Sequence, residues 1–253
     1  MNVEHELRRY YETLFAAWGP QHWWPAQSRF EVIVGAILTQ NTSWKNVELA
    51  LAKLRSARSL SVQAIRDVSL ADLEQLIRSA GFFRQKASRL KAFVSFVDTH
   101  YSGSLDRMFA RPTHELRAEL LVLNGIGPET ADSILLYAGN HPVFVVDAYT
   151  RRIVERHGLF PPRAKYDKIR EAFEQALSSE RAPSALRLHE DRPTIHSTSR
   201  MSKAKRSALA QRFNDMHGLI VQVGKHTCLS KVARCDRCPL RPFLPQSLAS
   251  SDI

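Results

Sequence analysis

The sequence predicts an all-α protein. Apolar residues recur at three- and four-residue spacing over most of the chain, which is the period of a helix that buries one face. In the first such stretch, residues 4–18, the apolar positions follow this spacing and Gly19-Pro20 ends the pattern. Helix boundary signals are the second observation, because Ser, Thr or Asp precedes several of these stretches and Gly or Pro follows them.

The expected helices follow in order along the chain. Residues 30–38 are so apolar that composition alone allows a buried helix or a strand, and we interpret them as a helix. Ser69, with Asp72 three residues later, predicts a capped helix start, and Thr113 predicts another cap. We therefore expect helices over residues 4–18, 30–38, 47–54, 70–80, 86–97, 113–123, 128–137, 147–154, 166–177 and 207–223.

Composition and charge limit the class of protein. The chain has 253 residues, 44% of them apolar, which is typical of a globular protein with one large or two small domains. Its apolar runs are far shorter than the ~20 residues of a membrane span, and the N-terminus lacks a secretory signal pattern. The chain has 36 Lys and Arg residues and 25 Asp and Glu residues, so its formal charge is +11. This charge favours a polyanionic partner, with nucleic acid ahead of a membrane surface.

Residues 180–206 differ from the rest of the chain. They lack apolar periodicity, are rich in Ser, Pro, Arg and His, and carry more basic than acidic residues. We interpret this segment as a long mobile linker, which serves either as a solvated spacer or as an arm that follows DNA.

Two helices joined by Asn124-Gly125-Ile126-Gly127 predict a helix-hairpin-helix. Both glycines allow backbone conformations that are closed to residues with a Cβ atom, and Pro128 fits the first position of the second helix. The unpaired N–H groups at such a helix start form a phosphate-binding site. That site would contact the nucleic-acid backbone without reading its sequence. The alternative is an ordinary turn between two helices.

Asp147 is the most informative single residue. It follows the apolar run Val143-Phe144-Val145-Val146 and directly precedes an expected helix. Asp at this place predicts a helix N-cap, and a capping carboxylate can still direct one oxygen into a cleft. A structural role and a chemical role are therefore compatible.

Several segments together resemble the helix-hairpin-helix DNA glycosylases, the endonuclease III superfamily. The likeness rests on residues 123–131, Val145-Val146-Asp147, Ile37-Leu38-Thr39-Gln40-Asn41-Thr42, residues 81–87 and the cysteine spacing near the C-terminus. The resemblance covers about residues 20–178 and 207–245. It implies two helical domains, one of residues 28–141 with the hairpin and one of residues 1–27 plus 142–253, with Asp147 at the cleft between them.

The same resemblance implies roles for individual residues. Asp147 is the expected catalytic carboxylate of an enzyme that removes damaged bases. The expected DNA contacts come from the hairpin and from the segment that fills the space left by an extruded base, namely Gly125, Ile126, Gly127, Thr130, Gln40 and Asn41. The implied partner is double-stranded DNA with a damaged base, bound by a monomer in the cytoplasm in association with the nucleoid.

Glu129 departs from the bifunctional branch of the family, which has a lysine two residues after the second hairpin glycine. That lysine amine forms a Schiff base with the sugar and cleaves the strand, and Glu129 has no amine. The resemblance therefore implies a monofunctional glycosylase, in which Asp147 stabilises a cationic transition state and orients water. Two alternatives remain: an endonuclease III-type glycosylase with AP-lyase activity on oxidised pyrimidines, with Lys225 as the amine, and a non-catalytic DNA-binding module.

The expected substrate follows from a closer resemblance to the 3-methyladenine DNA glycosylase branch. Trp23-Trp24-Pro25, the turn at residues 39–42 and Glu129 carry this likeness. In that branch aromatic walls favour positively charged alkylated purines by cation–π attraction. The expected base pocket includes Trp23, Trp24, Trp44, His217 and Lys225. The alternative is that the tryptophans pack in the core and that the other two residues are structural.

The three cysteines are clustered, which argues against a disulfide framework. Their spacing, Cys228-x6-Cys235-x2-Cys238, resembles the family's [4Fe–4S] loop, but Leu244 occupies the position of the fourth cysteine. Such a cluster normally takes four thiolates. A cluster with His226 as the substitute ligand, a zinc site made of the same residues and a loop held by packing alone all remain open.

Overall fold

The fold comes from a computed structural model of the chain, which describes residues 2–178 and 198–245. Within these ranges the regular secondary structure is helical, apart from an isolated bridge between Cys228 and Ala233, so the all-α prediction is confirmed. None of the described helices is long and apolar enough to cross a lipid bilayer. The chain divides into two compact units. We call residues 26–141 the hairpin unit, and residues 1–25 with 142–253 the terminal unit.

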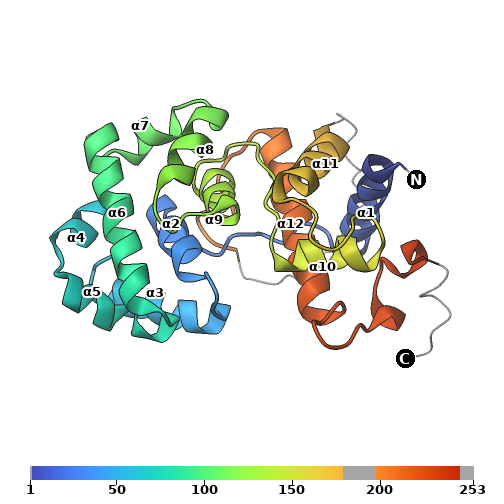
Figure 1. Cartoon of the computed structure of the whole chain (residues 1–253), viewed down its shortest axis with the longest axis horizontal. Coiled ribbons are helices and arrows are strands. Elements are labelled where there is room, and N and C mark those ends of the chain that lie inside the picture. Colours follow the sequence, from blue (N-terminus) through green and yellow to red (C-terminus); the bar gives the residue numbers. More distant parts are fainter. Residues whose placement is uncertain (1, 179–197, 246–253) are drawn as a thin grey trace. The chain divides into compact units, whose positions relative to one another are not determined.

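Helix α2 (Arg29–Leu38) forms the core of the hairpin unit. Ser28 caps it by accepting the N–H of Glu31, and every residue from 30 to 38 is buried, which explains the unbroken apolar run. Helix α2 contacts α3 (Trp44–Ser56), α6 (Phe83–Tyr101), α9 (Pro128–Ser133) and the π-helical turn η2 (Ile134–Ala138). The unit also contains α4 (Val62–Asp67), α5 (Leu70–Leu76), η1 (Arg78–Ala80), α7 (Leu105–Phe109) and α8 (Thr113–Val122) (Figure 1).

The terminal unit packs helices from both ends of the chain together. Helix α1 (Val3–Trp18) contacts α11 (Tyr166–Ser178) and α12 (Ala208–His226), and α12 also packs on α10 (Ala148–Arg156) (Figure 1). Helix α12 is the core of this unit, because all its residues from 213 to 224 are buried. Two 3-10 turns, η3 (Cys235–Arg237) and η4 (Arg241–Phe243), follow it.

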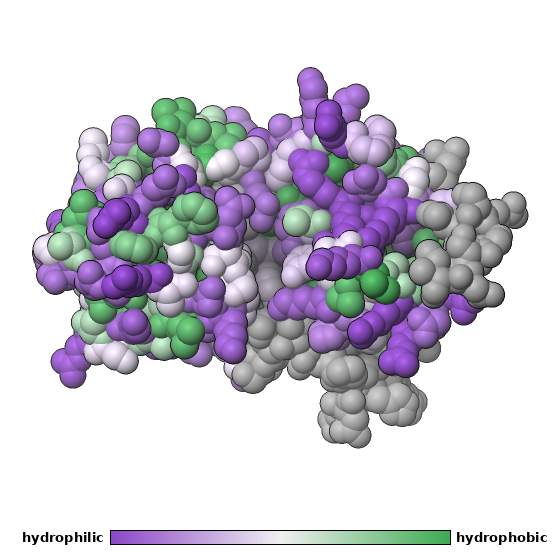
Figure 2. All heavy atoms as spheres, turned by 60° about the horizontal axis from the view of Figure 1, so that its bottom comes forward, coloured by the Kyte–Doolittle hydropathy of each residue, from purple (hydrophilic) through white to green (hydrophobic). Residues whose placement is uncertain are grey.

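The surface is mostly polar. Figure 2 shows hydrophilic residues over much of one face, with hydrophobic residues scattered among them. Among the described residues, the large apolar side chains that remain exposed are Leu49, Leu70, Phe82, Leu121, Val122 and Val232.

The structure confirms some helix boundaries and corrects others. The cap predicted at Ser69 is confirmed, because its Oγ accepts the N–H of Asp72 at 3.1 Å. The cap predicted at Thr113 is wrong, because this residue is already inside α8 and its Oγ1 hydrogen bonds with Nδ1 of His141 at 2.9 Å. The sequence pattern missed α4 and α7, whose six and five residues are too few to show a helical period.

The last part of the expected linker is packed against the protein. Residues 179–197 lie outside the described residues, but Ser199 and Met201 are buried. The Oγ of Ser199 donates to the carbonyl of Trp24 at 3.1 Å, and Nη2 of Arg206 donates to the carbonyl of Met201 at 2.7 Å. The linker prediction is therefore wrong for Ser199 and Met201, which are buried, whereas residues 198, 200, 203 and 205 are exposed.

A buried lysine ties α6 to the core of the hairpin unit. Lys86 is 1% exposed, and its Nζ donates to the carbonyls of Leu38 at 3.0 Å and Ala80 at 2.8 Å. These carbonyls belong to the last residues of α2 and η1, so one side chain satisfies acceptors at two helix ends. Burial and, to a smaller extent, the charge of Arg89 lower the pKa of Lys86 to about 8.

We expect the contribution of Lys86 to stability to rise as the pH increases from about 8 to 10.5, the folded and ordinary pKa values of this amine. In that range the unfolded chain still binds the proton and the folded chain does not, so a higher pH favours folding. The measurement is the free energy of unfolding in urea for wild type and Lys86→Met, since Met has no titrating group. A difference between the two proteins that stays constant over this range contradicts the prediction.

Candidate functional site

The turn between α8 and α9 needs a glycine at position 125. Gly125 has φ +82°, a left-handed conformation that residues with a Cβ atom rarely adopt. Arg89 also covers this residue, because an added Cβ would lie 2.1 Å from the Arg89 Nε. Ile126, between the two hairpin glycines, is 4% exposed and anchors the turn in the core.

Gly127 does not adopt a backbone conformation that only glycine tolerates, although the glycine pattern of the hairpin predicts one. Its φ of −88° and ψ of 178° are extended backbone that any residue adopts. No heavy atom lies within 4 Å of the place where a Cβ would be. The prediction that the backbone at position 127 requires glycine is therefore wrong. Gly127 instead leaves open space at the exposed start of α9.

Gln40 connects the turn after α2 with the hairpin. Its Nε2 donates to the carbonyl of Gly125 at 2.8 Å and to Oγ1 of Thr130 at 2.9 Å, and its Oε1 accepts from Nη1 of Arg89. The next residue, Asn41, has φ +52° and is exposed. In this structure the turn therefore presents Asn41 to the solvent, while Gln40 is bonded to the hairpin.

Phe82 is a candidate DNA-contacting residue that the sequence analysis does not single out. It is 64% exposed and has φ +45°. Because Lys86 bonds to the carbonyls of both Leu38 and Ala80, the turn with Phe82 lies beside the turn with Asn41. The helical period of the sequence does not predict this exposure, because an aromatic residue at such a position is normally expected to be buried in the core.

Asp147 caps α10 in the terminal unit. Its Oδ1 accepts hydrogen bonds from the N–H of Thr150 at 2.7 Å and from the Thr150 hydroxyl at 2.9 Å. Its Oδ2 lies 3.5 Å from Nε2 of His217 on α12, and the Asp147 side chain is 14% exposed. The structure thus brings together two candidate site residues that are far apart in the sequence.

Asp147 is ionised even though it is largely buried. Burial by itself raises the pKa of a carboxyl group, because it disfavours the charged form. The nearby imidazole of His217 and the two hydrogen bonds from Thr150 outweigh that effect and lower the pKa of Asp147 below its ordinary value. At neutral pH the group can stabilise positive charge or accept a proton, but it has no proton to donate.

Aromatic and basic side chains surround His217. The ring centroids of Trp23 and His217 are 6.0 Å apart, and Nζ of Lys225 lies 5.7 Å from the Trp23 ring centroid. The ring of Trp24 meets that of Trp23 in a T-shaped contact, with centroids 5.5 Å apart. The two tryptophans are only 6% and 5% exposed, so their rings pack mostly within the protein in this conformation.

Trp44, the remaining candidate for the base pocket, belongs to the hairpin unit. It is the first residue of α3, and its Nε1 donates to Oε1 of Glu48 at 2.9 Å. Its side chain is partly exposed. Trp23, Trp24, His217 and Lys225 therefore gather in one unit, and Trp44 lies in the other.

The three thiols line one cavity. The residues around this cavity include Cys228, Cys235, Cys238, Leu244, His157, Arg156, Arg234 and Arg241. Nδ1 of His157 hydrogen bonds with the Tyr10 hydroxyl at 2.8 Å, and the exposed His226 does not line the cavity. The cysteine loop therefore supplies three thiols, one fewer than the four protein ligands of a [4Fe–4S] cluster or a structural zinc site, and Leu244 stands at the fourth position. Among the residues that the structure describes, no group of three or more His, Cys, Asp or Glu side chains is arranged to hold a metal ion.

Two arginines of α10 anchor the cysteine loop. The side chain of Arg152 donates to the carbonyls of Cys228 at 2.8 Å and Gly224 at 3.0 Å. Nη1 of Arg156 donates to the carbonyl of Leu229 at 2.7 Å and lies 3.2 Å from Sγ of Cys228. Protein hydrogen bonds thus fasten the loop to the helix that begins at the candidate carboxylate.

We expect the purified protein to contain neither iron nor zinc in stoichiometric amounts and to lack the visible absorption of an iron–sulfur cluster. Metal analysis and an absorption spectrum of protein purified without oxygen test this. Because arginines hold the loop, Cys235→Ser should change the Tm by less than about 2 °C. Four irons per chain, together with a cluster spectrum, would contradict the argument from the donor set.

The two hairpin glycines should respond differently to serine. Gly125→Ser should destabilise the protein by more than about 1 kcal/mol, because left-handed backbone is costly for residues with a Cβ and the side chain collides with Arg89. Gly127→Ser should change stability by less than about 0.5 kcal/mol, since its backbone is extended and serine is a good N-cap. Urea unfolding of both variants is the measurement, and equal losses would refute the distinction.

The chain matches a known protein family and several named relatives. Residues 34–179 match the HhH-GPD superfamily of base excision DNA repair proteins. The chain is 43% identical over 239 residues to a protein of Methanocaldococcus jannaschii named as a DNA repair glycosylase, and the match covers 94% of each chain. It is 26% identical over 215 residues to endonuclease III of Sulfolobus acidocaldarius, covering 85% of this chain and 80% of that protein.

Solved structures agree with these sequence matches. The 3-methyladenine DNA glycosylase of H. pylori (MagIII), bound to 1,N6-ethenoadenine, is 30% identical with a TM-score of 0.69, covering 88% of this chain and 97% of that one. A non-covalent endonuclease III–DNA complex has a TM-score of 0.71 over 98% of both chains at 18% identity, which shows a shared fold. The chain therefore belongs to the HhH-GPD superfamily of base excision DNA repair proteins.

Proposed function

We propose that this protein is a monofunctional DNA glycosylase that acts as a monomer on double-stranded DNA with a damaged base. The observation that carries the proposal is the Asp147 carboxylate at the start of α10, which accepts two hydrogen bonds from Thr150 and lies 3.5 Å from Nε2 of His217. As the bond between sugar and base breaks, positive charge develops on the sugar, and a fixed carboxylate stabilises it. Water then adds to the sugar, and Asp147 orients it and accepts its proton.

The choice of water as the nucleophile rests on Glu129. This residue is exposed on the first turn of α9, where bifunctional relatives are expected to carry an amine. A carboxylate cannot form a Schiff base with the sugar. Lyase activity is the second candidate, because the amine of Lys225 lies over Trp23, in the same unit as Asp147.

The proposed substrate is an alkylated purine. In support, the 30% identical H. pylori enzyme was solved with 1,N6-ethenoadenine, a modified adenine. The electron-rich face of Trp23 already attracts the cation of Lys225, which is the interaction that a positively charged alkylated base would make. Because Trp23 and Trp24 are buried, a base can stack on them only after one of the rings or Lys225 moves.

The proposed DNA contacts lie on the hairpin and on the two turns beside it. The start of α9 at Gly127 offers backbone N–H groups to phosphates. Asn41 and Phe82 project from neighbouring turns that Lys86 holds together, and an aromatic ring can stack on the bases next to an extruded nucleotide. The net charge of +11 adds attraction that is independent of sequence.

Asp147→Asn should lower the single-turnover rate of base release by at least about 100-fold. Asn keeps a capping oxygen for α10 but carries no negative charge. The substrates are double-stranded DNA methylated with radiolabelled dimethyl sulfate, and duplex oligonucleotides that contain 1,N6-ethenoadenine or thymine glycol. A variant as fast as wild type would show that Asp147 is not catalytic.

Borohydride trapping on the same duplexes separates the candidate mechanisms. A monofunctional enzyme releases the base and leaves no covalent adduct. An adduct that disappears in Lys225→Gln would establish the lyase instead. If wild type binds these duplexes but releases no base from any of them, the chain is a non-catalytic DNA-binding module.

A further inference from the structure

A buried extended segment leads into Asp147. Residues 143–146 are 2% exposed or less and belong to no described helix or strand. Backbone N–H groups that are buried outside a sheet or helix must find other partners, because an unpaired one is costly. The partners of this segment therefore determine its position, and with it the position of the residue that follows.

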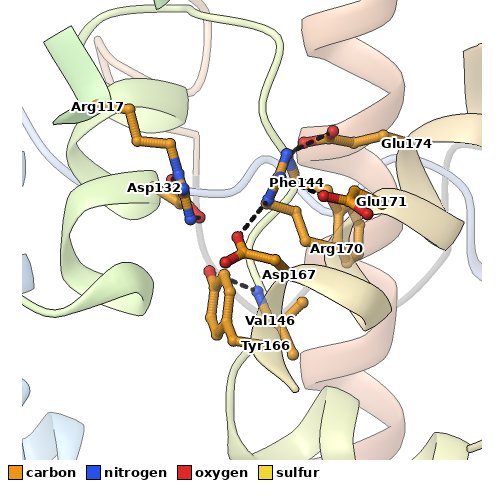
Figure 3. Close-up of polar contacts among 9 residues, drawn as sticks. All are labelled: Arg117, Asp132, Phe144, Val146, Tyr166, Asp167, Arg170, Glu171 and Glu174. Atoms are coloured by element: carbon orange, nitrogen blue, oxygen red, sulfur yellow. Dashed lines mark hydrogen bonds and ion pairs between the residues drawn. The ribbon is translucent and has the colours of Figure 1, made fainter. Parts of the chain in front are cut away.

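Side chains of α11 supply these partners. The N–H of Phe144 donates to Oε1 of Glu174 at 2.9 Å, and the N–H of Val146 donates to the Tyr166 hydroxyl oxygen at 3.2 Å. Figure 3 shows both side chains reaching the segment from the same helix. The ring of Phe144 also stacks on that of Phe173 of α11, with centroids 4.3 Å apart. Helix α11 thus does for this segment what a neighbouring strand does in a sheet.

Arg170 holds the Glu174 carboxylate in place. It lies between Tyr166 and Glu174 at four-residue spacing, so the three residues share one face of α11. Its Nη1 donates to Oε2 of Glu174 at 2.7 Å, which leaves Oε1 for the N–H of Phe144 (Figure 3). A hydrogen bond to a charged acceptor is stronger than one between neutral groups.

Tyr166 also lies near Arg151, in the first turn of α10. The Arg151 guanidinium lies 5.9 Å from the Tyr166 ring centroid, and its Nη1 donates to the carbonyl of Ala164 at 2.8 Å. The N–H of Arg151 closes the first turn of α10 on the carbonyl of Asp147 at 3.0 Å. Tyr166 therefore bonds to the residue before Asp147 and lies near the side chain of the residue that closes the first turn of α10.

We propose that Tyr166 and Glu174 are positioning residues for the Asp147 carboxylate. The proposal rests on the catalytic role proposed above for Asp147. Neither residue touches the substrate in this scheme. Together they hold the segment that aims the carboxylate, and a displacement of about 1 Å in a reacting group is enough to slow an enzyme about 100-fold.

The test compares single-turnover base release and DNA affinity in four variants, using duplex DNA methylated with dimethyl sulfate. Tyr166→Phe removes one oxygen and should lower the rate about fivefold, the equivalent of one uncharged hydrogen bond. Glu174→Ala leaves the N–H of Phe144 without its acceptor and should lower the rate of base release at least about tenfold. Glu174→Gln keeps an acceptor oxygen and should recover much of that loss. The Kd for duplex DNA with an abasic-site analogue should stay within about twofold of wild type, because positioning acts on the chemical step.

Glu171→Gln is the matched control. Glu171 is on the same helix and pairs with the same Arg170, at 3.2 Å, but it is mostly exposed and does not bond to the segment. Its rate should equal that of wild type. Thermal unfolding of each variant checks that the compared proteins are folded. If Glu174→Ala does not fold, the test rests on Tyr166→Phe.

Each outcome decides a separate point. Wild-type rates in both Tyr166→Phe and Glu174→Ala overturn the positioning proposal, and so does a loss of rate that is matched by an equal loss of DNA affinity. Asp147→Asn is measured alongside. If that variant is as active as wild type, the catalytic assignment itself fails. If it is inactive while Tyr166→Phe and Glu174→Ala are unaffected, only the positioning role fails.

Discussion

The need to keep one largely buried carboxylate ionised shapes the terminal unit. A buried charge is tolerated only when donors and opposite charge lie close to it. Thr150, on its own helix, donates two hydrogen bonds to Asp147, and the imidazole of His217, on α12, lies 3.5 Å from it. This requires α12 to pass very close to the start of α10. Gly224 permits that approach, because a Cβ there would lie 2.3 Å from the Tyr149 ring.

In the hairpin unit, a buried side chain also satisfies buried polar groups of the backbone. Its hydrogen bonds bring two exposed turns of this unit together. Lys86 satisfies carbonyls at two helix ends, and the chain after each of them turns outward with a residue at positive φ, Asn41 and Phe82. The amide of Gln40 then links the first of these turns to the hairpin at Gly125. A buried network thus positions a surface that faces the solvent.

Sequence patterns predicted the features that depend on neighbouring residues. The capping of α5 by Ser69 and of α10 by Asp147 needs only a polar side chain three residues before an N–H group. Tertiary contacts decided the rest. The period of the sequence cannot show that Phe82 is exposed, that Ser199 and Met201 are buried, or that Gly127 has extended backbone. His217 is among the residues expected in the base pocket. Its short distance from Asp147 depends on how α10 and α12 pack, which the sequence pattern does not show.

The lowered pKa of Asp147 bears on the proposed substrate, given the catalytic role proposed for this residue. A carboxylate with a lowered pKa cannot protonate a departing base at neutral pH. An oxidised pyrimidine leaves as an anion unless an acid protonates it, so such a substrate needs a donor that this carboxylate does not provide. A purine nucleotide alkylated at N3 or N7 already carries positive charge, and its base leaves as a neutral molecule. With the substrate proposed here, the carboxylate of Asp147 would stabilise the cation that forms on the sugar, and the activation of the leaving group would come from the substrate itself.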